Sequence, residues 1–112
     1  MPATAKIFLH NYDYANASGK GVFGSGSWIR PAFRDAKVPL VLHQACINFL
    51  IDAQTDLLER IAMALPGRVF LVDGRNTLSA GDWASELHPS ASGFKKLVHA
   101  AWKPHLIAAG LA

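Results

Sequence analysis

Arg68-Val69-Phe70-Leu71-Val72-Asp73, with Gly67 before it and Gly74 after it, is the stretch that decides the fold. An uninterrupted apolar run between glycines is typical of a strand that is buried on both faces. Such strands belong to parallel sheets, in which neighbouring strands are joined by a crossover that is usually a helix. We therefore expect a helix, and before it another buried strand, ahead of residue 68.

The expected helix and strand both lie upstream. A helical pattern opens at Pro39 and ends at Pro66-Gly67, and its apolar residues recur every three or four positions. This apolar stripe consists of Leu42, Cys46, Phe49, Leu50, Ala53, Leu57 and Ile61. The other buried strand is predicted from Ala5 to Tyr12, where apolar residues are contiguous. A right-handed crossover would make the two strands parallel neighbours.

Downstream, the loop from Gly74 to Pro89 leads into a last helix that is predicted over roughly Ala91 to Ala109. Pro104 should kink or interrupt this helix near its end. The residues expected to face the sheet are Phe94, Leu97, Val98, Ala101 and Trp102. The order strand, helix, strand, helix predicts one α/β domain over residues 1–112.

Two strands are too few for an independently stable sheet. At least one apolar strand edge should be left without a neighbour, and such edges tend to pair with other chains. The remaining strands must therefore come from other chains or from a longer protein.

The segment from Asp13 to Lys37 is predicted to be a long loop, either a functional lid or a poorly ordered connection. Its glycines lack the Gly-Lys-Ser/Thr ending of a phosphate-binding loop, so we interpret them as a source of flexibility. They are Gly19, Gly21, Gly24 and Gly26. Trp28 and Phe33 either line the substrate side of a lid or pack the loop against the body.

Composition excludes several classes of function. The chain has 112 residues, of which 51% are hydrophobic and 17% charged, as expected for a small folded domain. The net charge is +3 and the basic residues are scattered, which argues against nucleic-acid binding. No apolar run has the length of a membrane span, and the N-terminus lacks the apolar core of a signal peptide. We therefore expect a cytoplasmic protein.

No cofactor is predicted. Four of the five histidines show no spacing typical of metal ligands; they are His10, His43, His99 and His105. Cys46 is the one cysteine, so no internal disulfide can form, and its apolar helical context indicates a packed thiol.

His88 is the sharpest candidate for chemistry. Pro89 restricts the backbone of His88 toward extended geometry, and a helix follows almost at once. A histidine at this place can project over the carboxyl ends of the strands, where α/β proteins bind ligands. The alternative is a surface histidine beside a helix cap.

Several blocks in this order resemble the C-terminal half of SGNH (GDSL-type) hydrolases. They are His10-Asn11-Tyr12-Asp13-Tyr14, Val72-Asp73-Gly74-Arg75-Asn76-Thr77-Leu78, Asp82-Trp83, and Glu86-Leu87-His88-Pro89 with Gly93-Phe94. They look like the fourth strand, the fifth strand and the catalytic-histidine block of that family. The resemblance implies part of a flavodoxin-like three-layer fold and an activity on small ester substrates.

Within this resemblance His88 would be the general base that takes a proton from a serine hydroxyl and returns it to the leaving group. The family places an Asp three residues before this histidine, but Ser85 stands there in this chain. We favour Asp82 as the carboxylate that orients His88, with Glu86 as an alternative.

Two further acidic positions leave alternatives open. Asp73 could also orient His88, but we favour a turn role in which it pairs with Arg75 or caps Asn76. Tyr12-Asp13-Tyr14 follows a strand, so it should lie at the same sheet edge as His88. These side chains either shape a polar pocket or form a satisfied turn.

The nucleophile block of the family is missing. Gly81-Asp82 is followed by Trp83 instead of serine, and neither Ser25 nor Ser27 has nucleophile-elbow spacing. The Gly-x-Asn-Asp block that supplies oxyanion-hole donors is also missing. The first hypothesis is therefore a C-terminal portion of an esterase, inactive alone, whose partner is an N-terminal half. The alternative is a stand-alone, non-catalytic α/β domain that forms homo-oligomers through its strand edge.

Overall fold

The structure is a computed structural model that describes residues 5–21 and 27–112. Its sheet has two parallel strands, β1 (Ile7–His10) and β2 (Val69–Val72). Ile7 lies opposite Val69, and His10 lies opposite Val72. The mixed α/β class and the parallel pairing are thus confirmed. Both strands are shorter than predicted because the polar residues that follow them enter loops.

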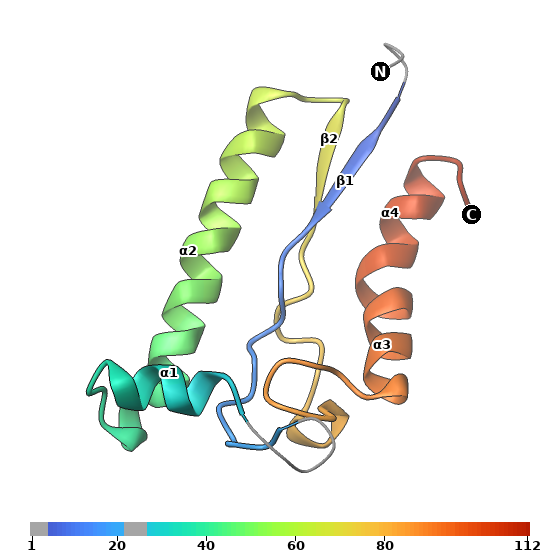
Figure 1. The fold of residues 1–112 in the computed structure, drawn as a ribbon. Coiled ribbons are helices and arrows are strands. Elements are labelled where there is room, and N and C mark those ends of the chain that lie inside the picture. The colour runs from blue at the N-terminus through green and yellow to red at the C-terminus, as the bar shows by residue number, and fades with distance from the viewer. Residues whose placement is uncertain (1–4, 22–26) are drawn as a thin grey trace.

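Figure 1 shows the two strands between two helical columns. On one side stands α2 (His43–Ala64), which follows a short 3-10 turn, η2 (Leu40–Leu42). On the other side stand α3 (Ala91–Leu97), the π-helical segment η4 (Val98–Trp102) and α4 (Lys103–Ala108). The helices that the sequence predicts after each strand are therefore present.

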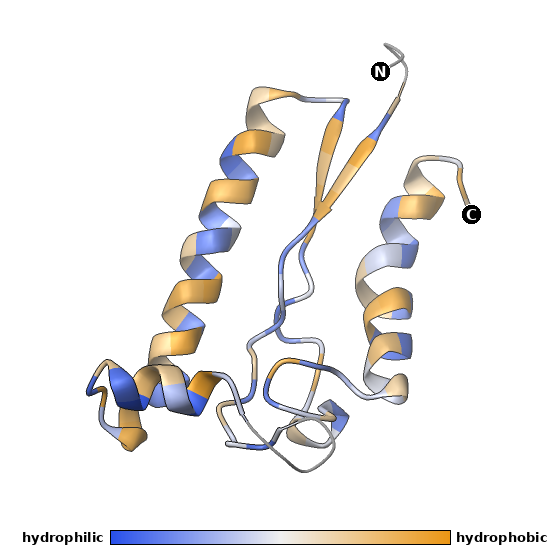
Figure 2. Cartoon of the chain, viewed as in Figure 1, coloured by the Kyte–Doolittle hydropathy of each residue, from blue (hydrophilic) through white to orange (hydrophobic). Residues whose placement is uncertain are grey.

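The apolar stripe predicted on α2 is largely exposed. Its buried residues are instead His43, Ile51 and Thr55. Phe49 is 72% exposed and Leu57 is 57% exposed, although both were expected in a core. Figure 2 shows orange bands that alternate with blue ones along α2. The apolar residues that face away from β2 have no layer to cover them in the described part of the chain.

The C-terminal helix is continuous, but it widens in its middle. Pro104 has no backbone N–H, so an ordinary α-helix would lose a hydrogen bond and meet a clash one turn earlier. The π-helical segment η4 lies at that turn, and Pro104 is then accommodated in the first turn of α4. The interruption therefore precedes Pro104.

The long loop predicted from Asp13 to Lys37 contains a helix, α1 (Ile29–Asp35). Ile29 packs in a buried cluster with Ala15 and Trp83. Phe33 contacts the ring of His43 on α2, with ring centroids 5.1 Å apart. This part of the segment thus packs against the body. The predicted flexible positions Gly24, Ser25 and Gly26 lie outside the described residues.

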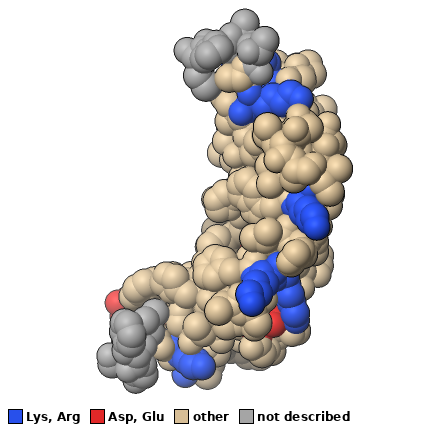
Figure 3. Space-filling view, turned by 90° about the vertical axis from the view of Figure 1, so that its right-hand side faces the viewer, with Lys and Arg blue, Asp and Glu red and all other residues tan. Residues whose placement is uncertain are grey.

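The molecule is more open than its length requires. Its radius of gyration is 16.1 Å, whereas a compact domain of this length has about 13 Å. Its accessible surface is 7163 Å², against about 6,000 Å² expected for a compact monomer of this mass. In the view of Figure 3 the outline is a crescent, and the basic residues are spread along its length. The protein is therefore less compact than a globular domain of the same length.

Candidate functional site

The loops that follow the two strands are held together by Asp13. Its buried carboxylate accepts hydrogen bonds from the backbone N–H groups of Tyr14, Asn76, Thr77 and Leu78, at 2.7 to 3.1 Å. A carboxylate with this many amide donors is fully satisfied. Of the two alternatives for Tyr12-Asp13-Tyr14, the satisfied turn is thus confirmed for the carboxylate of Asp13.

Asn11 fastens the same end of the sheet to α2. Its buried amide donates to Thr55 Oγ1 at 2.9 Å and to Asp73 Oδ1 at 2.7 Å, and its carbonyl oxygen accepts from Gly74 N at 2.8 Å. Thr55 is fully buried and donates its own hydroxyl to Ile51 O. One side chain therefore joins β1, α2 and the loop after β2.

Asp73 belongs to a charged network on the outer side of these loops. Arg75 donates hydrogen bonds from Nε and Nη2 to the carboxylate of Asp73, and from Nη1 to Asp52 Oδ1 at 2.8 Å. Tyr14 donates its hydroxyl to the same Asp52 oxygen at 2.6 Å. The hydrogen bond from Arg75 lowers the pKa of Asp73 to about 2. The predicted pairing of Asp73 with Arg75 is confirmed.

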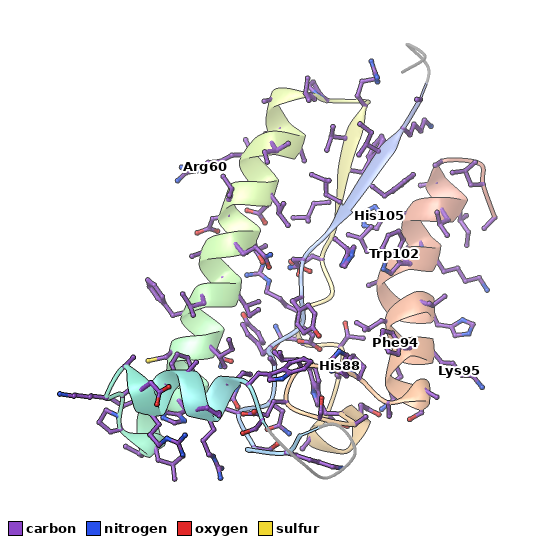
Figure 4. All side chains as sticks on the ribbon, viewed as in Figure 1. Arg60, His88, Phe94, Lys95, Trp102 and His105 are labelled. Atoms are coloured by element: carbon purple, nitrogen blue, oxygen red, sulfur yellow. The ribbon has the colours of Figure 1, made fainter. Side chains whose placement is uncertain are left out.

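His88 lies beyond the carboxyl ends of the strands, at the mouth of the loop that leads into α3 (Figure 4). Its carbonyl oxygen accepts from Ala84 N at 2.7 Å and from Ser85 N at 3.2 Å, which closes a tight turn. Trp83 and Pro89 pair on either side of this turn. His88 is exposed, and its ring forms a T-shaped contact with the Trp28 indole, with ring centroids 5.2 Å apart.

Ser85 is the partner of the His88 ring. Ser85 Oγ lies 3.1 Å from Nδ1 of His88. The same oxygen accepts from the backbone N–H groups of His88 at 3.2 Å and of Leu87 at 3.4 Å. Ser85 is 3% exposed, so its hydroxyl is closed off from solvent by this turn.

Asp82 does not bind His88, the partner that the sequence analysis favoured for it. Its Oδ2 accepts from Ser79 N at 2.9 Å, from Ser79 Oγ at 2.8 Å and from Lys96 Nζ at 2.7 Å. The hydrogen bond from Lys96 lowers the pKa of Asp82 to about 2. Asp82 therefore joins the loop to α3, and the structure does not bring its carboxylate to the His88 ring.

The carboxylate of Glu86, the alternative to Asp82, is also bound to groups other than the His88 ring. Its side chain is 1% exposed, and its carboxylate accepts from the backbone N–H groups of Trp28, Ile29 and Arg30 at 2.9 to 3.2 Å. These are N–H groups at the start of α1, which have no partner within the helix. Glu86 thus fixes α1, and with it Trp28, beside the His88 turn.

An apolar pocket of about 300 Å³ lies between β1 and the C-terminal helix. Its lining includes His10, Tyr12, Trp83, Pro89, Phe94, Leu97, Val98 and Trp102. His88 does not line it, although its neighbour Pro89 does. Ser27 lines a separate cavity of about 10 Å³ beside Trp28 and Ser85, which has room for about one water molecule.

Neither a metal centre nor a membrane span is found in the described residues. No group of His, Cys, Asp or Glu side chains in this part of the chain could hold a metal ion. None of the helices described here has the length and apolarity needed to cross a bilayer. No family model, curated protein or solved structure matches the chain.

Sequence reasoning missed the two residues that surround His88 most closely. Ser85 occupies the position three residues before His88, so the spacing signal was present, but a carboxylate was sought instead. Trp28 lies 60 residues before His88 in the chain, and no local pattern connects them. Its position depends on the buried carboxylate of Glu86.

Proposed function

We propose that this chain is the C-terminal portion of an SGNH-type serine esterase, with part of a flavodoxin-like fold, and that it supplies His88 as the general base. The placement of His88 beyond the carboxyl ends of an incomplete parallel sheet is the observation that carries this proposal. Ligands of α/β proteins bind at this end of the sheet. The serine nucleophile and the oxyanion hole belong to an N-terminal half.

Within residues 5–21 and 27–112, no strand pairs with the edge of β1 that faces away from β2, and this supports an incomplete sheet. Ile7 N and Asn11 N donate to carbonyls of the β2 segment at 2.8 and 3.4 Å, so these alternate residues direct their backbone toward β2. Phe8 and His10 direct theirs to the opposite side, because successive residues of a strand alternate. That side is the one on which a further parallel strand would pair.

Apolar surfaces on both helical columns support the same conclusion. Phe94 and Val98 on the C-terminal helix are 53% and 50% exposed, and Leu50 and Leu57 on α2 are 53% and 57% exposed. The accessible surface of 7163 Å² exceeds that of a compact monomer, about 6,000 Å², by roughly 1,200 Å². One partner of a stable interface buries about 800 Å². A missing half of a domain would account for this excess.

The chain should not hydrolyse esters by itself. Among the described residues, the side-chain hydroxyl that contacts the His88 ring is that of Ser85. This hydroxyl is buried, and its oxygen already accepts hydrogen bonds from two backbone amides. Preorganised donors for a developing oxyanion supply the largest catalytic term in many hydrolases, and the blocks that hold them are missing from this sequence. A small ester could use the apolar pocket near β1 for its acyl or alkyl group.

The experiment begins with the genomic DNA upstream of Met1. An in-frame segment that encodes Gly-Asp-Ser and Gly-x-Asn-Asp is expected, and the longer chain is then expressed and assayed with p-nitrophenyl acetate. His88→Ala should abolish turnover of the longer chain, whereas His99→Ala, an exposed histidine on η4, should leave it unchanged. An upstream region without these blocks, or full activity in His88→Ala, contradicts the proposal.

The free β1 edge also favours a second candidate, a non-catalytic domain that forms homo-oligomers. In a two-fold dimer the β1 strands of two copies could pair, and the exposed stripes of α2 could pack on each other. Sedimentation velocity at high micromolar concentration tests this candidate. A monomer under these conditions would contradict it, and Leu57→Lys should dissociate a dimer held by α2.

A further inference from the structure

The hydrogen-bonding capacity of Ser85 restricts the protonation of His88. A serine hydroxyl has one O–H donor and two acceptor lone pairs. Two backbone N–H groups, those of Leu87 and His88, already point at Oγ of Ser85. The one proton of the hydroxyl is then left for Nδ1 of His88, which lies 3.1 Å away. In that arrangement Nδ1 accepts the hydrogen bond and carries no proton.

We infer that Ser85 is a positioning residue that holds the neutral His88 ring in the tautomer with its proton on Nε2. A neutral imidazole has one N–H and one acceptor nitrogen, so an accepting Nδ1 places the proton on Nε2. Nε2 is then a hydrogen-bond donor toward whatever approaches the exposed edge of the ring.

This tautomer is the opposite of the one that a general base requires. In a serine hydrolase a carboxylate accepts the proton of Nδ1, which leaves Nε2 free to take the proton of the nucleophile. Ser85 stands where such a carboxylate would stand, but it donates instead of accepting. His88 must break its bond to Ser85 and change tautomer before Nε2 can act as a base. This consequence rests on the proposed function, whereas the tautomer itself does not.

The tautomer is measured by long-range ¹H–¹⁵N correlation spectra of the ¹⁵N-labelled chain at about pH 9, where a histidine ring is neutral. The His88 signals are assigned from their loss in His88→Gln. Wild type should show a protonated Nε2 and an unprotonated Nδ1. Ser85→Thr, which keeps the hydroxyl, should show the same pattern.

Ser85→Asp should reverse the pattern, because a carboxylate can only accept a hydrogen bond from Nδ1. Ser92→Asp is the matched control, since it adds the same charge at an exposed site in α3 and should leave the tautomer unchanged. Far-UV circular dichroism checks that the variants are folded.

A protonated Nδ1 in wild type overturns the inference, and this result needs no variant. An unchanged tautomer in folded Ser85→Asp, or a reversal in Ser92→Asp, also overturns it. None of these readouts depends on ester hydrolysis, so they are independent of the outcome for the proposed function.

Discussion

Glu86→Gln tests whether one buried carboxylate holds α1 in place. Three backbone N–H groups, those of Trp28, Ile29 and Arg30, donate to this carboxylate, which is 1% exposed. Hydrogen bonds to a charged acceptor each contribute about 1.5–3 kcal/mol. The amide of glutamine keeps one acceptor oxygen but turns an NH2 group toward one of the three donors. We expect α1 to open more easily by about 2–3 kcal/mol.

Amide hydrogen exchange provides the assay, because it reports local opening residue by residue. A factor of ten corresponds to about 1.4 kcal/mol, so the amides of residues 28–30 should exchange roughly 30- to 150-fold faster. Glu59→Gln removes a charge from an exposed position on α2 and should have no such effect. Less than about a threefold change in Glu86→Gln, or equal changes in both variants, would refute this reasoning.

Three other substitutions have expected outcomes. Asn11→Ala removes three hydrogen bonds, two of them buried, and leaves Gly74 N without the acceptor it has in wild type, so urea unfolding should show a loss of about 2–4 kcal/mol. The pKa of Asp73, near 2, lies below its unfolded value of about 3.9, so its ion pair stabilises the fold above about pH 4 and is lost as the pH falls toward 2. Asp73→Asn should flatten this acid dependence, by less than about 1 kcal/mol because the side chain is 39% exposed and screened, whereas Asp56→Asn should not. Gly93→Ala would press a methyl group against the backbone oxygen of Asp82, so thermal unfolding should reveal a loss of about 1–3 kcal/mol, with Ala100→Gly as a helix-propensity control.

The strands and α2 were predictable because their signals are local. Each strand is a contiguous apolar run, and α2 is bounded by Pro39 and by Pro66-Gly67. The start of α1 is different, because the carboxylate of Glu86 that satisfies its N–H groups lies 58 residues from Trp28 in the sequence. Burial on α2 was also mispredicted, because an apolar stripe shows which face can be covered but not whether a partner layer is present.

The candidate site was predictable in position but not in its contacts. The His88-Pro89 pair indicated a histidine at the mouth of a loop, and the structure places it there. The residue that contacts the His88 ring could not be predicted from the sequence. Asp82 instead binds Lys96, 14 residues later in the chain, and this contact depends on how α3 packs against the loop. The sequence therefore placed Ser85 three residues before His88 but did not indicate that its hydroxyl contacts the ring.

Asn11 and Asp13 have a consequence for how the chain avoids misfolding. β1 and β2 are apolar along most of their length, so a slip of two residues would keep the same faces covered. Such a slip would move Asn11 by about 6.6 Å relative to Gly74, far beyond hydrogen-bonding distance. Each buried polar group that lost its hydrogen-bond partner would then lower the stability of the fold by about 1–3 kcal/mol. Asn11 and Asp13 thus select the correct register of β1 against β2, which the apolar residues alone leave ambiguous. A design that transfers these two strands to another protein would have to keep both residues.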